Sequence, residues 1–296
     1  MENNVDVSIV IATFHRDATL TRALDSLNAQ TFKNFEVIVV DDNGSDEWHK
    51  KVFAIIERFS DLRIKYIKNE KNMGSAESRN IGIFNSVGKY IAFLDDDDEY
   101  LPEKIEKQYE FMKQGDYDFS ITDLELYNEN GKLADRRVRS YIKDYDKDSL
   151  LKYHFMYHMT GTDTLMFRRE YIIDVKGFGP VNVGDEFYLM QRAIEHGGKF
   201  GYLDRCDVKA YVHYSSNGMS SGNGKVYGEN ELFNYKKEYF SRFDNKSIRY
   251  IKMRHYAVLS FAEMRRKNFR ATVANGVKSF ASSPIGCIKL ISGRSI

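Results

Sequence analysis

The N-terminal third of the chain alternates short apolar runs with amphipathic stretches, and this alternation limits the folds that the chain can adopt. Between the apolar runs, Leu20, Leu24 and Leu27 fall on one face of a helix, and residues 75–87 form another helical pattern that Gly88 ends. Strands joined by helices predict a largely parallel sheet with right-handed crossovers, so we expect an α/β fold. Three runs are rich in β-branched residues, as in strands covered on both faces: residues 7–13 (VSIVIAT), 35–40 (FEVIVV) and 90–94 (YIAFL).

The rest of the chain changes from mixed structure to helix. Pro102 suits the start of a helix, Asn130-Gly131 predicts a polar hairpin, and the pattern is helical from about Tyr227 onward. We therefore expect an α/β domain over residues 1–224 and a C-terminal helical extension over residues 225–296. Further strands are expected over residues 117–127, 162–167, 199–203 and 208–214.

Composition excludes several classes of protein. The net charge of +1 predicts no general attraction to nucleic acid. Two cysteines, Cys206 and Cys287, cannot form a disulfide framework, and the N-terminus lacks the pattern of a signal peptide. No apolar stretch reaches the ~18 residues of a membrane-spanning helix. We expect a cytoplasmic protein that is either soluble or bound at the inner face of the cell membrane.

Four consecutive aspartates, Asp95–Asp98, follow the apolar run at residues 90–94. Carboxylates at this spacing repel one another, and a hard divalent cation held together with water and phosphate oxygens would relieve that repulsion. Strand alternation would place Asp95 and Asp97 on one side, and Asp96 and Asp98 on the other. The alternative is a solvated acidic turn in which Asp98 or Glu99 caps the next helix.

Two other polar segments, Thr13–Arg16 and Asp41-Asp42, also follow predicted strands. In parallel sheets the ligand crevice lies beyond the carboxyl ends of the strands, so all three segments are expected at one site. A carboxylate at Asp41-Asp42 could accept a hydrogen bond from a ribose hydroxyl or a base N–H. The alternative is an ordinary turn, since Asn43-Gly44 follows directly.

Four sequence blocks carry a resemblance to a known family: VSIVIATFHR, FEVIVVDDNGSDE, NMGSAESRNIGI and GKYIAFLDDDDEYLPEKIE. In order, spacing and strand context over residues 5–110 they resemble bacterial family 2 glycosyltransferases, and a looser resemblance continues to about residue 222. The resemblance implies the GT-A fold, with a Rossmann-like, mostly parallel central sheet flanked by helices. It also implies a metal-dependent, inverting transfer of a sugar from a nucleotide-diphosphate donor, expected to be a UDP-sugar, to a hydroxyl of a saccharide or lipid-linked acceptor in cell-surface polysaccharide synthesis.

The resemblance assigns roles in nucleotide binding to residues at the strand ends. Within the segment Thr13–Arg16, Thr13, Phe14 and Arg16 would line the nucleotide pocket. Asp42, with Asp41 beside it, would contact the uracil or ribose. Arg79 would approach the nucleotide or diphosphate, although an ion pair with a strand-end carboxylate is an equal alternative for this arginine.

The same resemblance assigns the cation site. Asp95, Asp96 and Asp97 would form the Asp-x-Asp motif, with Asp95 near the ribose and Asp97 as the ligand of Mg²⁺ or Mn²⁺. His213, at the end of a predicted strand, would touch the metal or the diphosphate. A purely structural histidine is the alternative for His213.

The catalytic base is expected in the acidic pair Asp185-Glu186, which precedes Phe187. Family 2 enzymes usually carry a Glu-Asp pair before an aromatic residue, with the aspartate as base, so the pair is reversed here. By register Glu186 takes the base position and Asp185 is its neighbour, although either carboxylate could serve. Both residues also suit the first turn of a helix, where acidic groups interact favourably with the helix dipole.

The segment 246–270 is strongly basic and aromatic. A basic amphipathic helix can lie on an anionic membrane surface, which would suit a lipid-linked acceptor. A solvated helix face or a contact in an oligomer such as a homodimer is the alternative. The basic residues of this segment are Lys246, Arg249, Lys252, Arg254, Arg265, Arg266, Lys267 and Arg270.

Two other functions compete with sugar transfer. A phosphoryl-transfer enzyme or receiver-like domain would also use strand-end aspartates, but Asp95–Asp98 lacks the Thr and distant Lys that such a site requires. A non-catalytic nucleotide-sugar-binding subunit of a polysaccharide assembly complex is the other alternative. The reversed pair Asp185-Glu186 is the feature that favours it.

Overall fold

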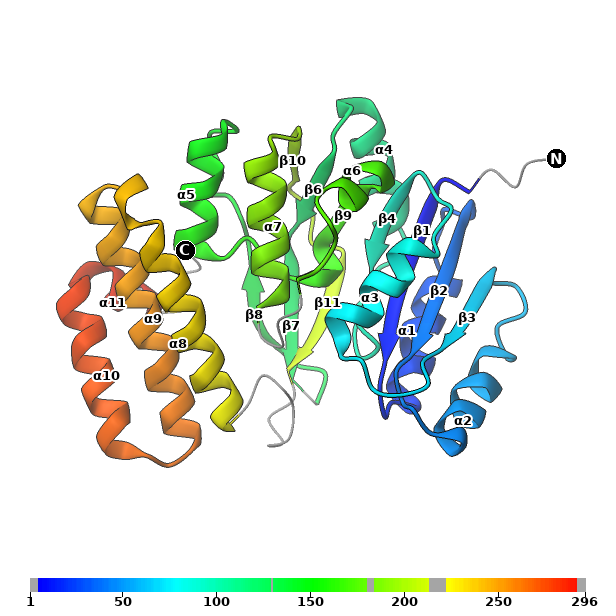
Figure 1. Cartoon of the computed structure of the whole chain (residues 1–296), viewed down its shortest axis with the longest axis horizontal. Helices are drawn as coiled ribbons and strands as arrows, with labels where there is room; N and C mark the ends of the chain where they lie inside the picture. The colour runs from blue at the N-terminus through cyan, green and yellow to red at the C-terminus, as the bar shows by residue number, and fades with distance from the viewer. Residues whose placement is uncertain (1–4, 129, 180–183, 213–221, 292–296) are drawn as a thin grey trace.

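The apolar runs form a central sheet of seven strands in the order β10-β6-β9-β4-β1-β2-β3 (Figure 1). The computed structural model describes residues 5–128, 130–179, 184–212 and 222–291. All neighbouring strands are parallel except β9, which runs antiparallel to β4 and β6. This mostly parallel sheet confirms the predicted α/β fold. Its strands are β1 (Val7–Thr13), β2 (Phe35–Asp41), β3 (Ile64–Lys68), β4 (Tyr90–Phe93), β6 (Phe119–Thr122), β9 (Leu165–Arg168) and β10 (Phe200–Leu203).

A second sheet has four strands in the order β5-β11-β7-β8. The single strand expected over residues 117–127 is wrong, because the chain leaves the first sheet after Thr122 and enters the second at Leu124. The polar hairpin is confirmed, with the Gly131 N–H donating to the Asn128 carbonyl (2.9 Å). The strands of this sheet are β5 (Glu99–Tyr100), β7 (Leu124–Asn128), β8 (Leu133–Arg137) and β11 (Val208–Val212).

Helices cover both faces of the central sheet (Figure 1). Because side chains alternate along β1, Ile9 packs with Leu24 of α1 on one face, and Val10 packs with Ile83 of α3 on the other. Helix α3 approaches β1 closely because Gly82 has no side chain: a Cβ there would lie 2.3 Å from a methyl carbon of Val10. The helices of the α/β part are α1 (Ala18–Asn28), α2 (Asp46–Ile56), α3 (Ser75–Phe84), α4 (Lys104–Gly115), α5 (Lys147–Tyr157), α6 (Arg169–Asp174) and α7 (Asp185–His196), with a 3-10 turn at Thr162–Thr164.

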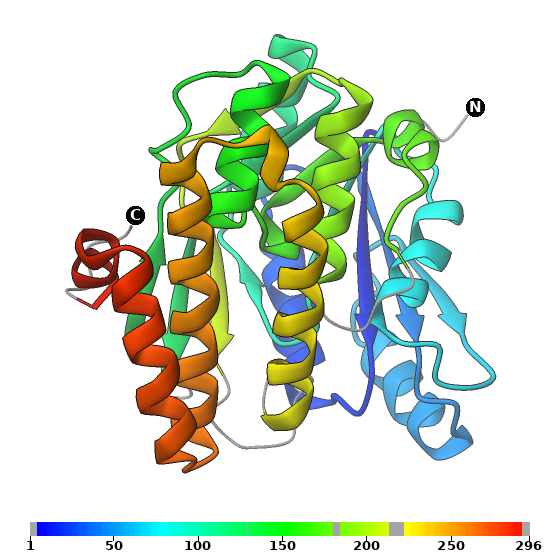
Figure 2. The ribbon, with the colours of Figure 1, turned by 60° about the vertical axis from the view of Figure 1, so that its left-hand side comes forward.

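Four helices end the described chain, and the first two of them lie beside α7 and α5 (Figure 2). They are α8 (Gly222–Glu238), α9 (Asn245–Arg265), α10 (Phe269–Ser282) and α11 (Pro284–Ile291). Helix α9 packs on α8, α10 and α5, and the Tyr235 hydroxyl of α8 donates to the Gln191 side chain of α7 (2.5 Å). Within the described ranges, no helix is both long and apolar enough to cross a membrane.

Candidate active site

The predicted site residues converge at one edge of the central sheet. Thr13 and Asp41 are paired in the parallel register of β1 and β2, and the turn after β4 follows on the other side of β1. Because β9 is antiparallel, its first residues reach the same edge, together with the preceding turn at Thr162–Thr164. The edge therefore joins segments that are far apart in sequence, from Thr13 to the start of α7 at Asp185.

The four aspartates form a turn and do not continue the strand. Strand β4 ends at Phe93, and the Asp98 N–H donates to the Asp95 carbonyl (3.1 Å), which closes a β-turn. The predicted alternation of Asp95 and Asp97 against Asp96 and Asp98 is therefore wrong. Instead, carboxylate oxygens of Asp95, Asp98 and Asp163 lie within 4.8 Å of one another.

Asp98 and Asp163 form the buried part of this group, at 5% and 3% exposed. Asp98 accepts a hydrogen bond from the Tyr211 N–H (2.8 Å), and Asp163 accepts one from the Asp95 N–H (2.6 Å). Burial and the neighbouring carboxylates raise the pKa of Asp163 to about 7 and the pKa of Asp98 well above its usual range. A hydrogen bond joins the two side chains, so this pair shares a proton that Asp98 donates to Asp163.

Asp163 was not predicted from the sequence. It belongs to the polar run TGTDT at residues 160–164, directly before β9. A polar run before a strand marks the catalytic edge only if that strand is antiparallel, and its direction was not evident from the sequence.

The other two aspartates of the turn contact the segment after β1. Asp96 accepts a hydrogen bond from the Phe14 N–H (3.3 Å), and Asp97 pairs with the Arg16 guanidinium (3.1 Å). Burial and the charge of Asp97 raise the pKa of Asp96 to about 7. The side chains of Asp95 and Asp97 keep 34% and 19% of their surface exposed, so these are the carboxylates of the turn that a ligand can reach.

The residues after β1 also form an aromatic stack. The rings of Phe14 and His15 lie 4.0 Å apart, and those of His15 and Trp48 lie 4.8 Å apart. The backbone of His15 is left-handed (φ 54°), and its N–H donates to the Asn43 side chain (2.7 Å). Phe14 is exposed at the end of this stack, beside Asp96, where the nucleotide pocket was predicted.

Asp41 and Asp42 are committed to contacts within the chain. Asp41 is fully buried and accepts hydrogen bonds from the Tyr66 hydroxyl (2.7 Å), His49 (2.7 Å) and Asn43. Asp42 accepts hydrogen bonds from the N–H groups of Met73 (2.7 Å) and Gly74 (2.8 Å) and from the Asn69 amide (2.8 Å). Both carboxylates order the turns around β2, which is the alternative interpretation of this pair.

Arg79 connects the acidic turn to the acidic pair of α7. Its guanidinium donates to Asp95 (2.7 Å) and to Asp185 (2.9 Å), and its side chain is 10% exposed. The charges of Asp95 and Asp185 outweigh the effect of burial and raise the pKa of Arg79, so it remains protonated. The ion pair predicted as the alternative role of Arg79 is thus present.

Asp185 and Glu186 begin α7 after Gly184, whose φ is 79°. Burial and the charge of Glu186 raise the pKa of Asp185 to about 7. Burial acts in the same sense on Glu186, but the charge of Arg79 and a hydrogen bond from Asp185 outweigh it, so the pKa of Glu186 is lowered. Glu186 also accepts a hydrogen bond from the Thr162 hydroxyl (3.1 Å). The pKa of Glu186 is therefore lower than that of Asp185, so Glu186 ionises first as pH rises.

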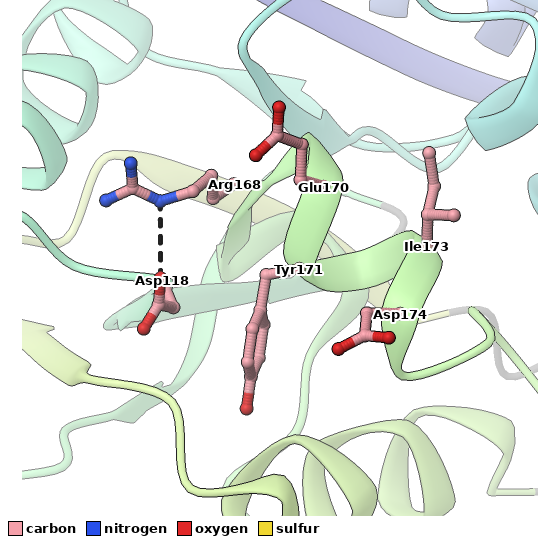
Figure 3. A pocket seen from close by; sticks show the side chains of 6 residues that line it. All are labelled: Asp118, Arg168, Glu170, Tyr171, Ile173 and Asp174. Atoms are coloured by element: carbon pink, nitrogen blue, oxygen red, sulfur yellow. Dashed lines mark ion pairs between the residues drawn. The ribbon is translucent and has the colours of Figure 1, made fainter.

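The last predicted site residue, His213, lies outside the described residues. Two hollows of about 520 Å³ each lie at the opposite edge of the sheet from the acidic turn. Figure 3 shows the first, where Asp118 precedes β6, Arg168 ends the antiparallel β9, and an ion pair joins the two (3.2 Å). Neither hollow is lined by a predicted site residue.

Comparison with known sequences identifies related proteins. A family model described as Glycosyl transferase family 2 matches residues 8–175. A glycosyltransferase of Methanocaldococcus jannaschii is 30% identical over 72% of this chain and 73% of its own length. The Escherichia coli protein WfgD, a UDP-Glc:alpha-D-GlcNAc-diphosphoundecaprenol beta-1,3-glucosyltransferase, is 36% identical over 42% of this chain and 47% of its own length. A glycosyltransferase of Rickettsia conorii is 42% identical over 44% of this chain, but the match spans only 21% of that relative.

Solved structures share the fold at low sequence identity. S. aureus TarS residues 1–349 in complex with UDP-GlcNAc is 18% identical, with a TM-score of 0.60 over 98% of this chain and 92% of that chain. The mannosyltransferase PcManGT of Pyrobaculum calidifontis in complex with GDP-Man and Mn²⁺ is 13% identical, with a TM-score of 0.57 over 99% of this chain and 77% of that chain. The architecture is the GT-A fold, as the sequence resemblance implied.

Proposed function

The chain belongs to glycosyltransferase family 2, and from this premise we propose that it transfers a sugar from a nucleotide-diphosphate donor to a hydroxyl group of an acceptor. The bridge formed by Arg79 carries this proposal. Arg79 binds Asp95 of the acidic turn and Asp185 of the acidic pair, and so it holds the donor end of the site against the catalytic carboxylates. A non-catalytic site that only bound nucleotide sugar would not require an ionisable Glu186 next to the Asp185 that Arg79 binds.

The proposed donor is a UDP-sugar. TarS, which shares the fold, is known in complex with UDP-GlcNAc, and WfgD uses UDP-Glc by its name. Phe14 offers an exposed ring at the end of β1, and Asp96 fixes the Phe14 backbone. We place the nucleotide over this segment and the diphosphate over the acidic turn.

A divalent cation, Mg²⁺ or Mn²⁺, suits the accessible carboxylates of the turn. Burial and the negative charge of Asp97 raise the pKa of Asp95 despite the opposing charge of Arg79. Additional positive charge at the turn would therefore stabilise its carboxylates. Asp98 and Asp163 are buried, whereas the side chains of Asp95 and Asp97 are partly exposed and can be reached by a cation that also carries water and phosphate oxygens. We therefore assign Asp97, with Asp95, to the cation. When bound there, the cation would act as a Lewis acid on the leaving diphosphate.

Glu186 is the proposed base. It would accept the proton of the acceptor hydroxyl as that oxygen attacks the anomeric carbon from the face opposite the diphosphate, which gives inversion. Asp185 would hold Glu186 through the hydrogen bond that it donates, and Arg79 would keep Glu186 ionised. In this way the reversed order of the pair is compatible with catalysis.

The proposed acceptor is a saccharide, free or lipid-linked, in cell-surface polysaccharide synthesis at the inner face of the cell membrane. The acceptor of WfgD is by its name linked to diphosphoundecaprenol. On this chain, apolar side chains of α10 and α11 are between 58% and 72% exposed: Phe269, Val273, Val277, Ile285 and Ile288. Three of them recur every fourth residue along α10 and so share one face. Apolar side chains on helices that also carry Arg270 and Lys278 suit contact with an anionic membrane surface.

The proposal is tested by a thermal-shift screen of nucleotide sugars with and without Mn²⁺, followed by UDP release in the presence of acceptors. We expect one UDP-sugar to raise the melting temperature only when Mn²⁺ is present, and to release UDP faster with a suitable acceptor. Stabilisation without turnover across a broad acceptor panel would instead favour the non-catalytic binding subunit. No stabilisation by any nucleotide sugar would overturn both.

A further inference from the structure

A short stretch of chain, residues 156–162, links Glu186 to basic side chains of the C-terminal helices. At one end the Thr162 hydroxyl donates to Glu186 (3.1 Å). At the other end Arg254 of α9 donates to the Met156 carbonyl (3.0 Å). Between them Lys236 of α8 contacts the His158 ring, and its ammonium also donates to the Phe155 carbonyl (3.2 Å). Two helices from the end of the chain thus bring basic side chains to the stretch whose other end contacts the proposed base.

A third cation reaches the same stretch from the second sheet. Arg139 is buried and donates to the carbonyl oxygens of Thr160 and Thr122, both at 2.6 Å. Two residues earlier, the exposed Arg137 ends β8, and its carbonyl accepts a hydrogen bond from Arg139 (3.3 Å). The charges of Arg254 and Glu186 both act on the pKa of Arg137. We call Arg137, Lys236 and Arg254 the basic cluster.

The charge of the basic cluster is not neutralised within the described part of the chain. None of its three members lies within ion-pair distance of a described carboxylate, whereas Arg16, Arg79 and Arg205 each pair with two. Carbonyl oxygens accept hydrogen bonds but carry no net charge. The acidic groups that act on the cluster from further away are Asp135, Glu186 and Glu229, of which Glu229 contacts His255 (3.2 Å).

Crowding of positive charge also affects the histidine at the centre. Burial, together with the charges of Lys236 and Arg254, lowers the pKa of His158 well below its usual value, so His158 is neutral. Its backbone is left-handed (φ 55°), a conformation that residues other than glycine adopt only at some cost. This conformation directs the chain from α5 toward Thr162.

Aromatic side chains lie beside Arg254. The rings of Tyr141 and Tyr157 are 4.2 Å apart, and those of Tyr157 and Tyr250 are 5.1 Å apart. All three tyrosines are partly exposed and lie within electrostatic range of Arg254. Ring faces and hydroxyl groups next to a guanidinium are a surface that suits a sugar attached to an anion.

We propose that the basic cluster binds a phosphate or diphosphate group of the acceptor and so positions the acceptor hydroxyl at Glu186. This inference rests on the proposed function, because it takes Glu186 as the base. Arg137 and Arg254 would contact the anion, since a guanidinium can give two parallel hydrogen bonds to a phosphate. Lys236 is buried, and burial lowers its pKa to about 7, so a bound anion would favour its charged form. The donor diphosphate is not the occupant, because it belongs at Asp95 and Asp97.

Calorimetric titration of the full chain tests this inference without knowledge of the acceptor sugar. The protein is first saturated with UDP and Mn²⁺, which fills the donor site, and is then titrated with decyl diphosphate, with inorganic phosphate and with the neutral decyl maltoside. The variants are Arg137→Gln and Arg254→Gln, and Arg58→Gln is the matched control, because Arg58 is an exposed arginine just after α2, far in sequence from the cluster and from α10. Melting temperatures and UDP affinity are measured first for every variant.

We expect decyl diphosphate to bind the wild type, and each cluster variant to weaken this binding about tenfold, as for the loss of a hydrogen bond to a charged group. Arg58→Gln should bind like the wild type, and decyl maltoside should not distinguish the proteins. Unchanged affinity for decyl diphosphate in both folded cluster variants would overturn the inference. So would an equal loss of UDP affinity in the cluster variants, which would place the donor at the cluster. Failure of the wild type to bind UDP with Mn²⁺ would instead count against the proposed function.

Discussion

The acidic turn at Asp95–Asp98 and the basic cluster differ in how their charges are stabilised. In the turn, Asp95 pairs with Arg79 (2.7 Å), Asp97 pairs with Arg16 (3.1 Å), and Asp98 shares a proton with Asp163. In the basic cluster, the hydrogen bonds of Lys236 and Arg254 go to the neutral His158 and to carbonyl oxygens. The turn is therefore ordered before any ligand arrives, whereas the cluster keeps its charge for an anion from outside.

The two regions also differ in how they are assembled. The turn consists of consecutive residues at the end of one strand, and its main partners come from the neighbouring β1 and from α3. The cluster brings together β8, α8 and α9, which span residues 133–265. We infer that the donor end can stay constant while the acceptor end changes with the helices that are packed against it.

The largest loss of activity should come from a substitution in the acidic turn. Comparing Asp97 with Asp98 tests whether the exposed carboxylates and the buried Asp98–Asp163 pair have different roles. We expect Asp97→Asn to lower kcat/KM by roughly three orders of magnitude, because it removes the negative charge that would hold the cation, and the cation in turn would stabilise the leaving diphosphate. Asp98→Asn should cost less than about tenfold, because an amide can still donate to Asp163 and accept from the Tyr211 N–H. Steady-state UDP release with saturating acceptor measures both.

Asp97→Asn and Asp98→Asn make the same change of side chain at adjacent positions of the turn, so each is the control for the other. If Asp98→Asn were as inactive as Asp97→Asn while its melting temperature was unchanged, Asp98 would need its negative charge. The proton-sharing pair would then be a cation ligand, and the distinction within the turn would fail.

The location of the acidic turn could be predicted from the sequence, whereas the assembly of the basic cluster could not. The buried strands β1, β2 and β4 were evident from their β-branched runs, and their ends located Asp95–Asp98 and Asp41-Asp42. The direction of β9 was not evident, so Asp163 was missed. The role of Arg254 depends on where α9 packs against α5, and the basic pattern of residues 246–270 does not contain that information.

The acidic pair gives the second-largest effect and tests which carboxylate is the base. Glu186→Gln should lower kcat by two to three orders of magnitude, as for the loss of a general base. Asp185→Asn should cost about tenfold or less, because an amide can donate a hydrogen bond to Glu186 and still accept one from Arg79. Single-turnover rates with each variant separate the chemical step from product release.

The pH dependence of kcat gives an independent test of the same assignment. Because the pKa of Glu186 is lowered from its usual value near 4.5, the base stays ionised as pH falls through neutrality, and kcat should decline only in acid. If Asp185 were the base, kcat would already halve near its pKa of about 7. A midpoint near 7 that disappears in Asp185→Asn would therefore reverse the assignment.

The smallest effect is expected at the apolar face of α10, on the acceptor side of the comparison. Phe269, Val273 and Val277 are exposed on one face of this helix, so replacing all three with serine should leave the fold intact. We expect the triple variant to lower co-sedimentation with phosphatidylglycerol vesicles by about tenfold, since each apolar group buried in the interface contributes modestly. UDP release with a water-soluble acceptor should stay within about twofold of the wild type, because these side chains lie outside both the turn and the basic cluster.

Phe84→Ser is the matched control for membrane binding, because Phe84 is equally exposed but lies at the end of α3. Its co-sedimentation should equal that of the wild type, since only the face that meets the bilayer contributes to binding. If the triple variant sedimented with vesicles as well as the wild type but changed from dimer to monomer in solution, the apolar face would be a contact between two chains. The acceptor would then bind near Glu186 without contact between this face and a membrane. Its recognition would depend on the charges of Arg137 and Arg254 alone.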